Sequence, residues 1–258
     1  MLEKIKTAVR EAGKLMLSDE KAEIFVKEGH ANLVTERDIA VQNYIIKALS
    51  EILPESCFFA EEKKENILTD DYTWIIDPID GTLNFIHNRR SSCISVALCK
   101  DKKPVIGVIY DPYHDELYYA EKGKGSWCNE TRLHVADTEY NLSVISLGSS
   151  PYDSHLAEKT MEAAKYFLLQ CADIRRKGSA ALELCDLAAG RLDGMFELKL
   201  SPWDFAAGFI IAEEAGAIIS TPEFDTPDYT APHCVIAAIP KCFDSMLKVI
   251  SEVYLDKK

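Results

Sequence analysis

Two aspartates stand where an apolar run breaks off, in the stretch WIIDPIDGTLNFIH that occupies Trp74 to His87. The apolar residues before the first aspartate predict a buried strand, Pro78 removes a backbone donor and blocks its continuation, and Gly81 permits backbone angles that other residues avoid. Asp77 and Asp80 can therefore converge at a turn. Two carboxylates a few ångströms apart repel each other, so such a pair is usually neutralised by a shared proton or a cation. This segment predicts the beginning of a metal site.

The residues after the aspartates add donors for an anion. The N–H groups of Gly81 and Thr82, together with the Thr82 hydroxyl, open the next segment and are available to a group such as phosphate. The sequence therefore predicts a site that combines a metal ion with a phosphate.

Two further acidic motifs flank this stretch, AEE at 60–62 and PWDFAAG at 202–208. With DPIDGTLNFIH between them, they resemble the inositol monophosphatase family of magnesium-dependent, lithium-sensitive phosphatases. The order and separation of the motifs also match, and the resemblance extends from about Ile5 to about Val249.

The resemblance implies a set of metal ligands drawn from all three motifs. They are Glu61, Asp77, Asp80, Asp204 and the backbone carbonyl of Ile79. Four carboxylates carry about four negative charges, enough to hold two divalent hard cations in oxygen coordination. Magnesium is the expected cofactor, with two or three ions per site, because no thiolate or histidine cluster favours zinc.

The resemblance also implies catalytic and substrate-binding positions. Glu61, Thr82 and Asp38 are the expected catalytic residues, with Asp38 holding Thr82 so that its hydroxyl helps to orient the attacking water. Asp38 equally completes a capping box with Thr35, and the two interpretations are compatible. The expected substrate-binding residues are Lys27, Gly81, Thr82, Gly178, Ser179, Ala180, Glu197 and Asp204.

The expected function is hydrolysis of a phosphate monoester, inositol 1-phosphate or a similar polyol phosphate, by direct attack of a metal-activated water. Glu197 and the NF dipeptide after DGTL favour this substrate. Fructose 1,6-bisphosphatase and 3'-phosphoadenosine nucleotide phosphatase are the alternatives within the superfamily, because the basic run at 175–177 and Lys199 could serve a second phosphate. From another class, a regulatory protein-binding role that retains the phosphatase site is also an alternative.

Composition limits the partners. The 258 residues are 47% hydrophobic, so the chain can bury a large core, and the formal net charge of -13 argues against a nucleic-acid or anionic-membrane surface. Eight cysteines form no CxxC pair and indicate reduced thiols in a cytoplasmic protein. No apolar run reaches transmembrane length. The resemblance further implies a homodimer.

The local patterns predict helices over 1–17 and 36–53, an antiparallel meander over 92–120, and alternating strands and helices after Asn141. We therefore expect an N-terminal α+β subdomain (1–140), with an antiparallel sheet and most metal ligands, and a C-terminal α/β subdomain (141–258) that completes the active site. Ser179 and Gly190 should bound one helix, and Asp204 should cap the next. The fold class is α+β, and the resemblance implies a layered α-β-α-β-α sandwich of the inositol monophosphatase and fructose-bisphosphatase type.

Overall fold

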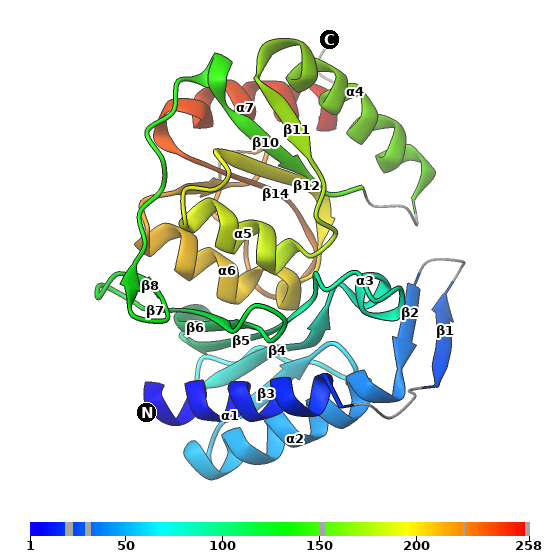
Figure 1. Cartoon of the computed structure of the whole chain (residues 1–258), viewed down its shortest axis with the longest axis vertical. Coiled ribbons are helices and arrows are strands. Elements are labelled where there is room, and N and C mark those ends of the chain that lie inside the picture. Colours follow the sequence, from blue (N-terminus) through cyan, green and yellow to red (C-terminus); the bar gives the residue numbers. More distant parts are fainter. Residues whose placement is uncertain (19–22, 29–31, 150–152, 224, 256–258) are drawn as a thin grey trace.

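Two sheets and three layers of helices alternate in the computed structural model of the protein (Figure 1). The structure describes residues 1–258 except 19–22, 29–31, 150–152, 224 and 256–258, and for residues 27, 28 and 32 it describes the backbone alone. Among the described residues, no helix combines the length and apolar character needed to cross a membrane.

The first sheet has seven strands in the order β3-β4-β5-β6-β7-β8-β9. β3 and β4 are parallel and every other pair is antiparallel. The strands are β3 (Cys57–Ala60), β4 (Thr73–Asp80), β5 (Cys93–Lys100), β6 (Lys103–Asp111), β7 (Glu116–Glu121), β8 (Ser126–Cys128) and β9 (Thr131–Arg132). Helices α1 (Leu2–Met16) and α2 (Glu36–Ile52) cover its outer face (Figure 1).

The apolar run before Asp77 is continuous because helices cover both faces of this sheet. Trp74 and Ile76 belong to the core beneath α1 and α2, whereas Ile75 belongs to the core on the opposite face. Successive strand residues point to opposite faces, so a strand buried on both sides needs apolar residues at every position.

The second sheet has five strands in the order β11-β10-β12-β14-β13. Its strands are β10 (Val144–Leu147), β11 (Asp173–Arg175), β12 (Gly194–Leu200), β13 (Ile218–Ser220) and β14 (His233–Ala238), and a short 3-10 helix, η1 (Tyr140–Leu142), precedes it. Helices α4 (Ser154–Gln170) and α7 (Pro240–Tyr254) cover its outer face, and α5 (Ala180–Ala188) and α6 (Pro202–Glu214) lie between the two sheets (Figure 1). The predicted α-β-α-β-α layering is confirmed.

The middle layer is packed too closely to shift. All nine residues of α5 are buried. A Cβ on Gly208 of α6 would lie 2.4 Å from Leu184 Cδ1 of α5, and one on Gly107 of β6 would lie 2.6 Å from the Ala207 carbonyl oxygen. Because real Cβ contacts of this length do not occur, these glycines allow α6 to sit directly against both neighbours. The position of the α6 N-terminus is therefore fixed by the core.

The predicted turn at Pro78 is wrong, because β4 continues to Asp80. Its pairing with β5 shifts register there: Asp77 is opposite Ser95 and Asp80 is opposite Cys93, so three steps on β4 match two on β5. A bulge of this kind tolerates a proline, since one residue leaves the hydrogen-bonded ladder. The strand is therefore irregular where the sequence predicted that it would end.

Several short elements were not predicted, including one hairpin and one short helix. The hairpin of β1 (Ile24–Glu28) and β2 (Asn32–Thr35) lies beside the layers (Figure 1), and the five-residue helix α3 (Thr82–Ile86) follows Gly81.

The predicted boundaries of two helices are confirmed. Ser179 caps α5, and Gly190, with a φ of +68°, follows its C-terminal end. Thr35 and Asp38 form the capping box of α2.

Candidate metal centre

Three aspartates from two elements meet at the edge of the middle layer. Asp77 and Asp80 come from β4, and Asp204 comes from the first turn of α6. One carboxylate oxygen of each lies within 4.8 Å of the others. Asp77 and Asp80 are only 2% and 7% exposed. The three groups are therefore close together, with two of them buried and Asp204 half-buried.

The bulge in β4 explains why Asp77 and Asp80 can face one site. In a regular strand, residues three apart point to opposite faces of the sheet. The register shift between Asp77 and Asp80 inserts an extra residue, which lets both side chains point the same way. The three-residue spacing of Asp77 and Asp80 therefore suits a common site because of the bulge between them.

Each aspartate uses one oxygen to accept a backbone N–H. Ile79 donates to Asp77 Oδ1 at 2.9 Å, Ala181 to Asp80 Oδ2 at 2.8 Å, and Ser201 to Asp204 Oδ2 at 2.7 Å. These bonds fix the orientation of each carboxylate without using its second oxygen.

The prediction that Asp204 caps its helix is wrong in one respect. Helix α6 begins at Pro202, so Ser201 is the N-cap and Asp204 is the third helical residue. The sequence pattern places the PW dipeptide before the helix, but proline is well suited to the first helical position because it lacks the donor that would be unpaired there. Asp204 still accepts the backbone N–H of Ser201, the second half of a capping box.

Burial raises the pKa of Asp77 and of Asp204 well above the ordinary range, and it raises the pKa of Asp80 to about 6. The charge of Glu61 raises the pKa values of all three further. The cluster therefore carries more negative charge than its surroundings stabilise. A cation would relieve this repulsion, and an all-oxygen donor set suits a hard divalent ion such as Mg²⁺.

Glu61 and Ile79 lie next to this group. Glu61 follows β3, and its N–H donates to the Ile76 carbonyl of β4 at 3.1 Å, which places it beside the strand that carries Asp77. A side-chain hydrogen bond also joins Glu61 and Asp77. The Ile79 carbonyl, an expected ligand, accepts the Thr82 hydroxyl at 3.0 Å.

Thr82 links the cluster to α2. Besides its bond to Ile79, Thr82 Oγ1 lies 3.4 Å from Asp38 Oδ1, while Asp38 Oδ2 accepts the Thr35 N–H at 2.8 Å. Asp38 is fully buried. The two interpretations of Asp38 that the sequence left open are therefore geometrically compatible, since a different oxygen serves each contact.

The segment 177–181 approaches the cluster from α5. The Ser179 hydroxyl donates to Asp80 Oδ2, the oxygen that also accepts the Ala181 N–H. Ala180 is buried beside them. Gly81 adopts a φ of +86°, and a Cβ there would lie 3.0 Å from the Ser91 carbonyl oxygen and 3.1 Å from that of Gly178. Conformation and space both require glycine at this position.

The remaining predicted residues lie in different places. Glu197 of β12 packs over Gly148, where a Cβ would lie 1.9 Å from Glu197 Oε2, and its charge helps to raise the pKa of Asp204. It therefore lies on the Asp204 side of the cluster. Lys27 belongs to β1, and its side chain lies outside the described residues.

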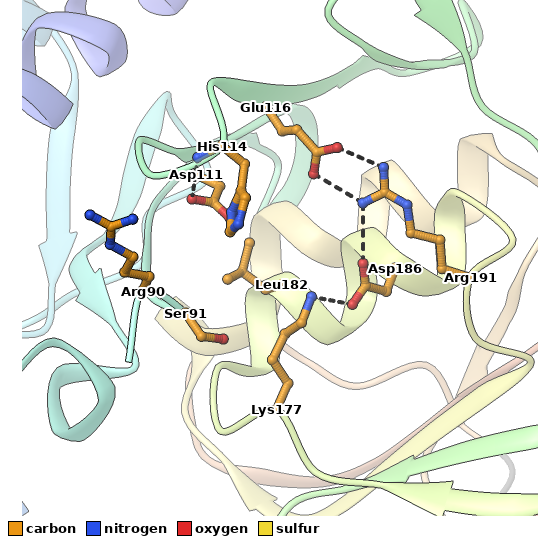
Figure 2. A pocket seen from close by; sticks show the side chains of 9 residues that line it. All are labelled: Arg90, Ser91, Asp111, His114, Glu116, Lys177, Leu182, Asp186 and Arg191. Carbon is orange, nitrogen blue, oxygen red and sulfur yellow. Dashed lines mark hydrogen bonds and ion pairs between the residues drawn. The ribbon is translucent and has the colours of Figure 1, made fainter. Parts of the chain in front are cut away.

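The basic run at 175–177 makes other contacts. Arg175 pairs with Asp173, Arg176 Nε donates to Ser149 Oγ at 3.1 Å, and Lys177 pairs with Asp186. Lys177 lines a polar cavity of about 400 Å³, in which Arg191 also pairs with Glu116 at 2.6 Å (Figure 2). None of the three clustered aspartates lines this cavity.

Sequence reasoning missed three residues that support the cluster. Asn84 Nδ2 donates to the carbonyl oxygens of Ser91, Lys177 and Gly178 at 2.7, 3.0 and 3.1 Å. Cys93 Sγ lies 3.9 Å from Asp80 Oδ2. Glu183 Oε1 accepts the N–H groups of Lys177 and Gly178. Only Asn84 gave a signal, as part of the central motif, since the others depend on contacts between distant segments.

Comparison with known proteins places this geometry in a family. The sequence model described as "Inositol monophosphatase family" matches residues 1–253. A putative Nus factor SuhB of Neisseria meningitidis serogroup B is 35% identical over 249 residues, 95% of each chain. An inositol-1-monophosphatase of Bacillus subtilis is 33% identical over 253 residues, 96% of this chain and 93% of that one.

Solved structures agree with the sequence match. The extragenic suppressor protein suhB of Bartonella henselae has a TM-score of 0.90 and 30% identity, covering 97% of this chain and 98% of its own. The IMPase of Thermotoga maritima has a TM-score of 0.88 and 30% identity, and the match covers 99% of this chain and 98% of that one. The chain belongs to the inositol monophosphatase family. Its relatives include proteins named as inositol monophosphatases and others named SuhB.

Proposed function

We propose that this protein hydrolyses a phosphate monoester with Mg²⁺ as cofactor, and that inositol 1-phosphate is its preferred substrate. The observation that carries the proposal is the cluster of Asp77, Asp80 and the half-buried Asp204, whose pKa values are all raised. A protein gains nothing in stability from three crowded, desolvated carboxylates, so such a group is best explained by a cation that it holds in function.

The three clustered aspartates, Glu61 and the Ile79 carbonyl would hold two or three Mg²⁺ ions. When bound, Mg²⁺ supplies positive charge that polarises the phosphoryl group and the attacking water and neutralises the leaving group. The backbone N–H bonds to each aspartate keep the ligand set in place before the metal arrives. Such preorganisation reduces the reorganisation needed during reaction.

The protein's own groups would position the water and the phosphate. Asp38 holds the Thr82 hydroxyl near the cluster, which supports a role for Thr82 in orienting the water. The left-handed conformation of Gly81 turns the chain sharply there, which favours exposure of the Gly81 and Thr82 N–H groups to phosphoryl oxygens. No phosphorylated enzyme intermediate is expected.

Glu197 and the basic run bear on the substrate. A carboxylate on the Asp204 side of the site can accept hydrogen bonds from polyol hydroxyls and would repel a second phosphate. Arg175 and Lys177 already pair with acids of this chain, which weighs against a bisphosphate site. Two solved structures of a relative called SaIMPase-II, 26% and 28% identical to this chain in the two comparisons, contain bound inositol monophosphate and bound 2'AMP, respectively. Nucleotide phosphates therefore stay in the test, as does fructose 1,6-bisphosphate.

We also propose that the protein is a cytoplasmic homodimer that acts on a small phosphate ester, without nucleic-acid or membrane partners. All eight cysteines are free, and five of them are buried, which supports a reducing compartment.

A second candidate function comes from the names of the relatives. Proteins named Nus factor SuhB are 34–36% identical to this chain. A regulatory role through a protein partner, with the phosphatase site retained, is therefore our second proposal. The two roles are separable, because the first requires the acidic cluster and the second does not.

The experiment is a phosphate-release panel with the purified protein in Mg²⁺. The panel contains inositol 1-phosphate, fructose 1,6-bisphosphate, 2'AMP and adenosine 3',5'-bisphosphate, with Asp77→Asn as the control. We expect inositol 1-phosphate to have the highest kcat/KM and the control to be inactive. Absence of release from every substrate would contradict the enzyme assignment and leave the regulatory role.

A further inference from the structure

The side chains of Glu183 and Asn84 form hydrogen bonds with the main chain of Lys177 and Gly178. Glu183 bonds the N–H groups, and Asn84 bonds the carbonyl groups. Glu183 Oε1 accepts the two N–H groups, at 2.6 Å from Lys177 and 3.1 Å from Gly178. Asn84 Nδ2 donates to the two carbonyl oxygens, at 3.0 and 3.1 Å. The N–H and the carbonyl of both residues are therefore engaged by side chains, one from α5 and one from α3.

The segment held in this way leads directly to the acidic cluster. Ser179, the next residue, donates its hydroxyl to Asp80, and Ala181 adds its N–H to the same oxygen. The Gly178 carbonyl lies where a Cβ on Gly81 would approach within 3.1 Å. A displacement of Lys177 and Gly178 would therefore reach Asp80 and the Gly81 turn together.

We infer that Glu183 is a positioning residue of the metal centre, acting through the 177–179 segment on Asp80. This inference rests on the proposed function of the cluster. Glu183 is only 2% exposed, and its carboxylate accepts hydrogen bonds from two backbone donors. Carboxylates are costly to bury, so one that binds backbone N–H groups beside a metal ligand serves the geometry of that ligand.

Two substitutions of Glu183 separate the effect of side-chain length from the effect of charge. Glu183→Asp keeps the charge and withdraws the carboxylate by one methylene, so it no longer reaches both N–H groups. Glu183→Gln keeps an acceptor oxygen at the same reach and loses the charge. If Glu183 acts by position, the aspartate variant should be the more damaged, whereas a purely electrostatic role would damage the glutamine variant.

The probe is Mn²⁺, titrated into the 258-residue chain without substrate and followed by electron paramagnetic resonance. We expect Glu183→Asp to bind Mn²⁺ about 10- to 100-fold more weakly than the wild type, the scale for losing a residue that orients a metal ligand. Glu183→Gln should stay within a few-fold of the wild type. Asn84→Ala, which releases the same segment from the other side, should also weaken Mn²⁺ binding.

Asp193 provides the matched control. It is a buried carboxylate whose Oδ2 accepts the Val144 N–H at 2.8 Å. Asp193 immediately precedes β12, whereas α6 follows the other end of that strand. Asp193→Ala should lower the thermal stability and leave Mn²⁺ affinity unchanged. Three outcomes would overturn the inference. Glu183→Asp could bind Mn²⁺ as tightly as the wild type, or Glu183→Asp and Glu183→Gln could lose the same Mn²⁺ affinity. The third outcome is a loss of Mn²⁺ affinity in Asp193→Ala that matches the loss in Glu183→Asp. A wild type that releases no phosphate would refute the proposed function, while the Mn²⁺ titrations would still decide the role of Glu183.

Discussion

Ala181 donates its backbone N–H to Asp80 Oδ2 at 2.8 Å, so a residue of the middle helix layer holds an acid that is 101 positions earlier in the chain. The seven-stranded sheet supplies the carboxylate and α5 supplies the donor. The acidic cluster is therefore assembled by packing between layers, and substitutions on either side should affect it.

The acidic cluster should be unfavourable for stability in the absence of metal. Asp77→Asn removes one of the repelling charges, so we expect a higher melting temperature than the wild type in the presence of a chelator. The same change should lower kcat by at least ~100-fold, the scale of a major electrostatic contact. Calorimetry and phosphate release measure the two effects. Near-normal turnover at saturating Mg²⁺ would contradict the assignment of Asp77.

Gly81→Ala should destabilise the protein and abolish activity, because it combines a left-handed φ with a Cβ 3.0 Å from the Ser91 carbonyl oxygen. Gly123→Ala is the control, since Gly123 has a φ of +77° but a Cβ added there would meet nothing within 4 Å. It should cost only the conformational strain, about 1–2 kcal/mol. Chemical denaturation gives both values, and equal losses would show that the crowding at Gly81 has no effect.

Glu183 should make the stability depend on pH. Burial raises its pKa from an ordinary 4.5 to about 7, so the folded protein binds this proton more tightly than the unfolded chain. The resulting contribution to stability is complete below about pH 4.5 and is lost as the pH rises to about 7. Relative to Glu183→Gln, the wild type should lose about 2–3 kcal/mol across that interval. A constant difference between the two unfolding free energies would refute this.

Glu197→Gln should alter specificity more than catalysis. The change should reduce kcat/KM for inositol 1-phosphate by about 1 to 3 kcal/mol, the range for a hydrogen bond to a charged group. Glycerol 2-phosphate, which offers fewer hydroxyls, should be affected much less. Equal losses on both substrates would assign Glu197 to the support of Asp204, whose pKa it already raises.

Lithium should inhibit in an uncompetitive or nearly uncompetitive manner. A monovalent ion that replaces the more loosely held Mg²⁺ would leave product phosphate poorly released, so inhibition should deepen as substrate increases. A staphylococcal relative at 25% identity was solved as a LiCl-soaked inhibitory complex. Initial rates at varied substrate and millimolar Li⁺ test this, and insensitivity with Mg²⁺ still required would contradict it.

Local patterns predicted the helices over 1–17 and 36–53 and the antiparallel meander, whereas the expected α-β-α-β-α layering came from the resemblance to the family. The local patterns failed at Pro78, where a bulge accommodates a residue that normally ends a strand, and at the β1–β2 hairpin, where Ile24, Phe25 and Val26 are all exposed and show no alternation. Local patterns do not encode these outcomes.

Within the site, the aspartates could be found because they stand in compact motifs. Their supports could not, since Glu183 and Asn84 act on a segment that only the fold brings to Asp80. Ser179 shows the difference between what local sequence predicts and what depends on tertiary packing. Its place before a helix predicted a cap, but its bond to Asp80 depends on the packing of α5 against the seven-stranded sheet.

If Asp77, Asp80 and Asp204 hold Mg²⁺ as proposed, their division between β4 and α6 would couple Mg²⁺ binding to folding. An ion that binds only when the sheet and the helix are in contact shifts the equilibrium toward the native state by mass action, by about 2.7 kcal/mol at a concentration 100 times its Kd. Cellular magnesium would then set the abundance of folded protein as well as its turnover, and chelation would lower both.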